Sequence, residues 1–258
     1  MKNSKCIFII FLSLMTILTH SQNLSKGEVI GKAGIQRMLC IKMAKSYMSI
    51  GAGIKTRDSA KELDDASSLF NENFNDLTIY AKTKETKDAS TFVGYLWTKF
   101  REKISSTPSV DQSPSVITDS YNLMQACNVV AEKFVVSTNS KTAILPNICG
   151  KQRMFAQKLG MLYMAKYWRI PYKNLDKDLC ETIANYETGL ETLVKAEENT
   201  EDINTILKLQ KNEWAYLKKS FDPEEKTNLL PASIFNSTNL MTRNFDKATA
   251  LYEKLVMN

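Results

Sequence analysis

A repeated helical motif constrains the fold of this chain more than any other feature. Residues 33–42 read AGIQRMLCIK, and 116 residues later residues 149–158 read CGKQRMFAQK, so a Gly-x-Gln-Arg-Met core recurs. Apolar residues around the motif recur too, in the pairs Leu63/Leu179, Phe70/Tyr186, Phe74/Leu190, Leu77/Leu193 and Trp97/Trp214. Similar repeats bury their apolar faces against each other, so the matched residues should lie around a shared centre.

The spacing of apolar residues is helical throughout, and the alternation typical of strands is absent. It predicts helices at about 25–54, 57–80, 89–105 and 116–138, and a second set from about Pro146 to the C-terminus. Short connections between long amphipathic helices favour antiparallel neighbours. We therefore expect an all-α fold of two tandem antiparallel four-helix bundles, with one merged helical domain as the alternative. The boundaries are 22–139 for repeat 1 and 140–258 for repeat 2.

The N-terminus has the order of a secretory signal peptide. Two lysines precede an apolar run from Cys6 to Leu18, and polar residues follow up to Ser21, after which we expect cleavage. The apolar run is short for a membrane span, and no later segment is apolar enough to cross a bilayer. The mature chain is therefore expected to be periplasmic or secreted and without a membrane span, with an uncleaved N-terminal anchor as the alternative.

The composition excludes several kinds of chemistry. The only histidine, His20, lies in the predicted leader, so the mature chain has no histidine base, metal ligand or phospho-acceptor. Charges of both signs are interspersed and the net charge is only +6, so no basic patch points to nucleic acid. Glycine-rich phosphate loops and recognisable metal clusters are also missing from the sequence. We expect no enzyme activity, no catalytic residues, no metal and no cofactor.

Four cysteines follow the leader: Cys40, Cys127, Cys149 and Cys180. An oxidising compartment permits disulfides, and the three connectivities stay open because no cysteine matches another between the halves. The reading we favour is that most of them are small buried apolar residues.

Each motif helix carries an arginine in a stripe of small side chains, because Arg37 and Arg153 lie three or four residues from small neighbours. Gly34 and Gly150 thin the same surface. If the motif helices pack together, the arginines face each other, and two unit charges about 4 Å apart repel by about 4 kcal/mol at an effective dielectric near 20. An anion between them reverses the sign, and a guanidinium fork matches a planar oxyanion such as nitrate. These four residues are the predicted ligand site.

Gln36 and Gln152 stand beside the arginines and could add amide donors to this site. In the alternative reading, a carboxylate neutralises each arginine and no ligand binds. Three acidic residues are near enough in sequence to do so: Glu28, Asp64 and Asp65. The matched Lys42 and Lys158 lie off the arginine stripe, and we expect both to be solvated.

The segments Ala33-Gly34-x-x-Arg37-Met38-x-x-x-Lys42 and Gly150-x-x-Arg153-Met154-x-x-x-Lys158 resemble the PilJ/NarX-type sensor domain of type IV pili methyl-accepting chemotaxis transducers. In that family the motif lies on the first helix of a periplasmic four-helix bundle. In its nitrate and nitrite sensors, arginines from two first helices hold the anion at a dimer interface. The resemblance implies two tandem copies, in which Arg37 and Arg153 are those arginines. The chain departs from the pattern at Cys149, which replaces alanine, and at Pro146.

The expected function is an exported sensor module that binds a small, nitrate-like or nitrite-like anion. The sequence shows no output module before its end at Asn258, so a membrane-bound signalling partner would carry the signal, in chemotaxis or a related pathway. The alternative is a structural or protein-interaction helical scaffold that has lost the ligand.

Overall fold

A computed structural model of the chain describes residues 24–138, 144–221 and 230–257, and the predicted signal peptide lies outside them. Over these residues the fold is all-α, as predicted, and contains no strand. The helices are α1 (Lys26–Gly51), α2 (Thr56–Tyr80), α3 (Lys84–Ile104), α4 (Ser113–Thr138), α5 (Ile144–Tyr167), α6 (Leu175–Val194), α7 (Glu201–Leu217), the short 3-10 helix η1 (Lys218–Phe221) and α8 (Pro231–Met257).

Several helix starts are encoded locally. Ser25 forms a capping box with Glu28: its hydroxyl accepts the Glu28 backbone N–H at 3.2 Å, and the Glu28 carboxylate accepts the Ser25 N–H at 2.7 Å. Thr83 caps α3 through the backbone N–H of Thr86, which explains why α3 begins before the predicted residue 89. Pro146 lies in the first turn of α5, where its missing N–H leaves no helical bond unmade.

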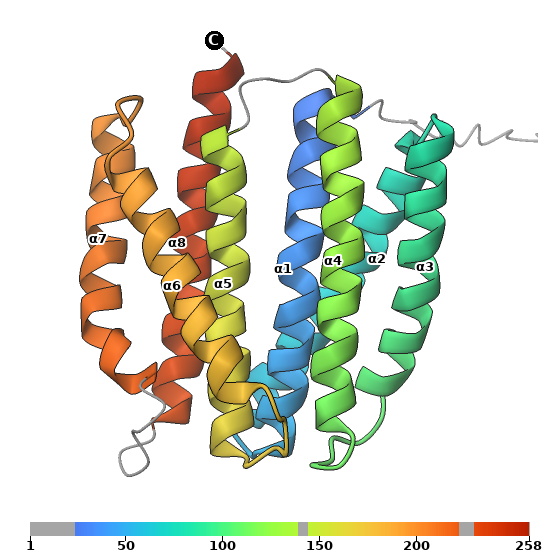
Figure 1. Cartoon of the computed structure of the whole chain (residues 1–258), viewed down its shortest axis with the longest axis vertical. Coiled ribbons are helices and arrows are strands. Elements are labelled where there is room, and N and C mark those ends of the chain that lie inside the picture. Colours follow the sequence, from blue (N-terminus) through green and yellow to red (C-terminus); the bar gives the residue numbers. More distant parts are fainter. Residues whose placement is uncertain (1–23, 139–143, 222–229, 258) are drawn as a thin grey trace, which may run out of the picture.

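The helices pack as two sets of four. α1 packs on α2 and α4, and α3 packs on the same two helices; in the second set, α5 and α7 both pack on α6 and α8. α1 and α5 also pack on each other and join the two sets at the centre of the molecule (Figure 1). Both helices begin at the upper end in Figure 1 and run in the same direction. This is the arrangement expected of matched helices, while a common origin of the two halves stays a prediction.

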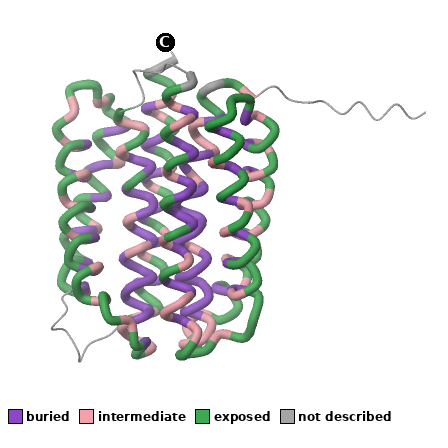
Figure 2. Tube along the Cα trace, turned by 45° about the vertical axis from the view of Figure 1, so that its right-hand side comes forward, coloured by how far each residue is buried: buried purple, intermediate pink, exposed green. Residues whose placement is uncertain are grey.

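The core follows this central pair of helices, whose middle turns are buried on nearly every face (Figure 2). The outer helices bury a single stripe each, as amphipathic helices do. Three cysteines, Cys40, Cys127 and Cys149, are buried and unbridged in this core, and Cys180 is exposed. None of the described helices is both long and apolar enough to cross a membrane. Because the middle turns of α1 and α5 are buried on nearly every face, a polar side chain there needs an internal partner or a ligand.

Candidate functional site

The two arginines of the repeat meet at one cavity. Arg37 on α1 and Arg153 on α5 line it together with Gly34 and Gly150, and its volume is about 300 Å³. A Cβ atom on Gly150 would lie 3.3 Å from Nη2 of Arg37 and 3.4 Å from Nη2 of Arg153; on Gly34 the distances would be 3.5 and 3.7 Å. The structure therefore brings the four residues together, and the glycines leave the space in which both guanidinium groups converge.

Arg37 is 5% exposed and is held by amides. Its Nη1 donates to Oδ1 of Asn128 on α4 at 2.9 Å, and its Nη2 donates to Oδ1 of Asn147 on α5 at 3.1 Å. Within the described parts of the chain it forms no ion pair with a carboxylate. Burial, together with repulsion from Arg153, lowers the pKa of Arg37 to about 10, so the side chain is still charged at neutral pH.

Arg153 is equally buried but has a carboxylate partner. Its Nη1 donates to Oδ1 of Asp246 on α8 at 2.8 Å, and the Asp246 side chain is 45% exposed. The Nε of Arg153 is buried and has no hydrogen-bond partner among the residues described. Nη2 likewise makes no hydrogen bond within those residues. Arg153 lines the cavity and keeps donors unused, the buried Nε among them, at a cost in free energy unless something accepts them.

Two further carboxylates line the cavity. Glu132 on α4 accepts a hydrogen bond from Nδ2 of Asn128 at 2.7 Å, which connects it to Arg37 through that amide. Glu253 on α8 approaches α1, since its Oε1 would lie 3.6 Å from a Cβ on Gly31. Burial raises the pKa of Glu253, and the nearby charge of Arg153 opposes that shift. The surroundings of the arginines are therefore mixed in charge.

The predicted contribution of the glutamines is wrong. Gln36 points to α2, where its Nε2 donates to the backbone carbonyl of Phe70 at 3.1 Å. Gln152 is buried against α6, so close to Gly189 that a Cβ there would lie 1.7 Å from its Nε2. Neither lines the arginine cavity. The physical reason is helical geometry, since successive residues point about 100° apart and a residue adjacent to an arginine faces a different neighbour.

The carboxylates suggested as neutralising partners also lie elsewhere. Glu28 belongs to the cap of α1, and Asp65 pairs with Lys61 at 2.6 Å on the exposed face of α2. Asp64 lines a separate hollow on α2 and α3. The partner of Arg153 is Asp246, a residue on α8 whose position relative to α5 depends on tertiary packing.

The matched lysines are not fully solvated, contrary to expectation. Lys42 is 25% exposed in its side chain and lies 3.6 Å from Glu62 on α2. Lys158 is half-buried, and its ammonium lies 4.5 Å from the centre of the Tyr121 ring. The ammonium groups of both lysines thus have partners on other helices.

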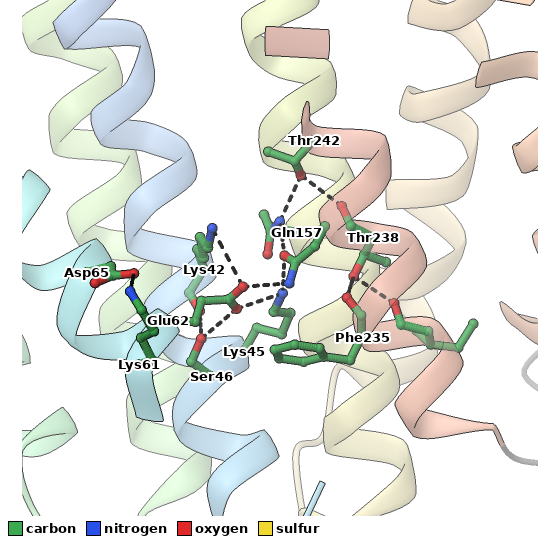
Figure 3. Close-up of polar contacts among 12 residues, drawn as sticks. Lys42, Lys45, Ser46, Lys61, Glu62, Asp65, Gln157, Phe235, Thr238 and Thr242 are labelled. Carbon is green, nitrogen blue, oxygen red and sulfur yellow. Dashed lines mark hydrogen bonds and ion pairs between the residues drawn. The ribbon is translucent and has the colours of Figure 1, made fainter. Parts of the chain in front are cut away.

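A third buried cation, Lys45, lies further along α1 (Figure 3), and its side chain is fully buried. Its ammonium pairs with Glu62 at 2.8 Å, donates to Oδ1 of Asn239 on α8 at 2.7 Å, and lies 4.4 Å from the centre of the Phe235 ring. To reach α8 its stem crosses α5 at Gly160, where a Cβ would lie 2.9 Å from its Cδ. Lys45 thus passes through a notch in α5 that only glycine leaves open.

The charged groups of the Lys45 cluster are extensively hydrogen-bonded, although the buried Oε1 of Gln157 has no partner among the described residues. The other carboxylate oxygen of Glu62 accepts from Nδ2 of Asn239 at 2.6 Å, and Oδ1 of Asn239 also accepts from Nε2 of Gln157 at 3.0 Å. Burial lowers the pKa of Lys45 to about 8, against the attraction of Glu62. Burial alone would raise the pKa of Glu62, but the charges of Lys45 and Lys42 outweigh it and hold that pKa below its usual value. The cluster connects α1, α2, α5 and α8 (Figure 3).

Lys45 was not predicted from the sequence, because the prediction was based on residues that the two halves share. The position matched to Lys45 in the second half is Met161. A lysine among the apolar residues of an otherwise buried helical stretch was the available signal.

No protein-family model, curated protein or solved structure matches this chain. The resemblance to PilJ/NarX-type sensor domains therefore depends on the motif residues alone, and the function has to be argued from the geometry of the site.

Proposed function

We propose that the chain is an exported, PilJ/NarX-like ligand-binding module that holds a small oxyanion between Arg37 and Arg153. One observation carries the proposal: two buried guanidinium groups converge on a cavity, and among the described residues only one of them has a carboxylate partner. The described side-chain partners of Arg37 are uncharged amide oxygens, which leave its charge uncompensated, and Arg153 retains unused donors. An anion would accept these hydrogen bonds and offset the repulsion between the arginines.

Binding would act on the contact between α1 and α5. An anion that bridges the two arginines favours arrangements in which these helices are close, and so shifts the angle between the two sets of helices. A membrane-bound signalling partner would read that angle. In this proposal the two motif helices of one chain supply the paired arginines that the resembling sensors obtain by dimerisation.

The alternative function, a helical scaffold without a ligand, is favoured by the ion pair between Arg153 and Asp246. A carboxylate 2.8 Å from the guanidinium already supplies a negative charge, as an anion would. Asp246 does not reach Arg37, however, and it is nearly half-exposed, so its neutralisation of the pair is incomplete.

The test is calorimetric titration of residues 22–258 with nitrate, nitrite, acetate, chloride and sulfate at constant ionic strength, alongside thermal unfolding. We expect selective binding of a planar oxyanion, and a higher melting temperature in its presence because the ligand stabilises only the folded state. Arg37→Met and Arg153→Met should each abolish binding and leave the helix content unchanged.

The matched control is Arg101→Met, because Arg101 is an exposed arginine on α3. It should bind like the wild type. Binding that survives in both cavity variants would refute the site, and the absence of any anion response would favour the scaffold.

A further inference from the structure

The arginine cavity is larger than an inorganic oxyanion needs. Its volume of about 300 Å³ lies at the lower end of the range of small-molecule pockets. Liquid water takes about 30 Å³ per molecule, so nitrate between the arginines would leave most of this space to solvent. The size of the cavity points to a ligand with more than an anionic group.

The walls beyond the arginines are largely apolar. They are formed by Ile30 of α1, Ala131 and Val135 of α4, and Ile144 and Pro146 of α5. Such walls gain free energy from covering hydrocarbon, since removing apolar surface from water is favourable in proportion to its area. Ile144 is 69% exposed and Val136, another lining residue, is 80% exposed, so apolar surface extends outward from the cavity.

The charges around the arginines favour a monoanion. Arg153 already faces Asp246, and the same cavity contains Glu132 and Glu253, against one further cation, the exposed Lys151. A dianion such as sulfate would meet these carboxylates with two charges, whereas a carboxylate brings one charge and two coplanar oxygens for the guanidinium forks.

We infer that the ligand is a monocarboxylate with a short aliphatic tail, whose carboxylate lies between Arg37 and Arg153 and whose tail lies along Ile30, Ala131 and Pro146. This inference rests on the proposed function and specifies its ligand class. In this arrangement the carboxylate lies where the two guanidinium groups converge. The hydrocarbon tail lies against the apolar walls.

The first experiment is a calorimetric titration with acetate, butyrate, hexanoate and octanoate. Affinity should rise by about threefold to fourfold for each methylene group that the walls bury, until the tail reaches the mouth. Hexanol, which has the tail without the charge, should bind at least a hundredfold more weakly than hexanoate, and Arg37→Met should remove this difference.

Substitutions of residues in the apolar walls of the cavity test where the aliphatic tail lies. Ala131→Leu places three additional carbon atoms in the cavity, so it should weaken hexanoate binding at least tenfold and leave acetate binding unchanged. Val129→Leu, on the exposed side of the same helix, is the matched control and should change neither. Thermal unfolding of both variants without ligand verifies that they fold.

The outcomes separate the inference from the proposed function. Equal affinity for acetate and hexanoate, lost in Arg37→Met, would overturn the aliphatic tail and keep the oxyanion site. Tighter binding of 6-aminohexanoate than of hexanoate would also overturn it, because the carboxylates of the cavity would then select a zwitterion. The absence of binding by every anion would overturn both.

Discussion

The two buried cation clusters on the α1–α5 contact solve the same problem differently. Lys45 has a carboxylate, a side-chain amide oxygen and an aromatic face around its ammonium, and its partner Glu62 is itself hydrogen-bonded. Of Arg37 and Arg153, which border a cavity, only Arg153 is paired with a carboxylate among the described residues, the half-exposed Asp246, and its buried Nε has no partner there. We call the lysine cluster closed, because its charges are paired with each other, and the arginine site open, because it keeps unused donors and borders a cavity.

The difference shows how a structural buried charge is distinguished from one available to a ligand. Burying a charge costs several kcal/mol, about as much as its partners return, so a cation kept for the fold should be surrounded by partners. A cation with unused donors beside a cavity can still donate hydrogen bonds to a ligand from solution. Within one chain, Lys45 is thus the internal reference against which the arginines are judged.

The largest expected effect is at the closed cluster. Glu62→Gln removes the carboxylate and leaves the Lys45 ammonium buried without a counter-charge, which should lower the free energy of unfolding by about 3–5 kcal/mol. Urea unfolding followed by circular dichroism measures this loss. Asp65→Asn is the control on the same helix: its exposed pair with Lys61 should change stability by about 0.5 kcal/mol at most. Equal effects of the two variants would contradict the comparison.

The same carboxylate predicts a pH dependence. The folded pKa of Glu62 lies below its unfolded value, so the unfolded state binds the proton more tightly. The stability that Glu62 contributes is therefore present above about pH 4.5 and is lost as the pH falls through the folded pKa. Unfolding measured from pH 6 down to pH 3 should show the wild type approaching Glu62→Gln. A constant gap between the two would argue against an ionised Glu62.

A smaller effect, on the affinity of the arginine site for anions, is expected from removing the carboxylate of Asp246, which competes with the ligand for Arg153. Asp246→Asn takes away the one carboxylate paired with Arg153, so affinity for acetate or nitrate should rise, by about fivefold at most because the pair is half-exposed. Asp119→Asn, which breaks the ion pair with Lys103, should leave the affinity unchanged. A loss of affinity in Asp246→Asn would mean that this carboxylate orients Arg153 for the ligand.

The smallest effect is expected when Arg37 is removed and the stability of the ligand-free protein is measured. Arg37→Met replaces a desolvated charge that Arg153 repels by an apolar side chain of similar length, so the free energy of unfolding should change by less than about 1 kcal/mol. Urea unfolding without added anion measures it. A loss as large as that in Glu62→Gln would show that Arg37 is a structural residue.

The sequence predicted the features that follow from helical spacing and from the repeat. Helical spacing and the repeat were enough to predict the all-α fold and to place Arg37 and Arg153 with their glycines at one surface. The partners on other helices were not predictable, because Asn128, Asn147 and Asp246 reach the arginines through the registers of α4, α5 and α8, which no local pattern specifies. The prediction that Gln36 and Gln152 lie at the site did not hold, because residues adjacent in sequence point about 100° apart on a helix.

The notch at Gly160 makes the contact between the halves selective. At the matched position the first half has Ala44, and a Cβ in the place of Gly160 would lie only 2.9 Å from the Cδ of Lys45. Two first halves from different molecules would therefore collide if they paired in this way, and two second halves would lack the lysine altogether, because Met161 replaces it. Each half is shaped to recognise the other rather than a copy of itself, which disfavours the pairing of two first halves or of two second halves.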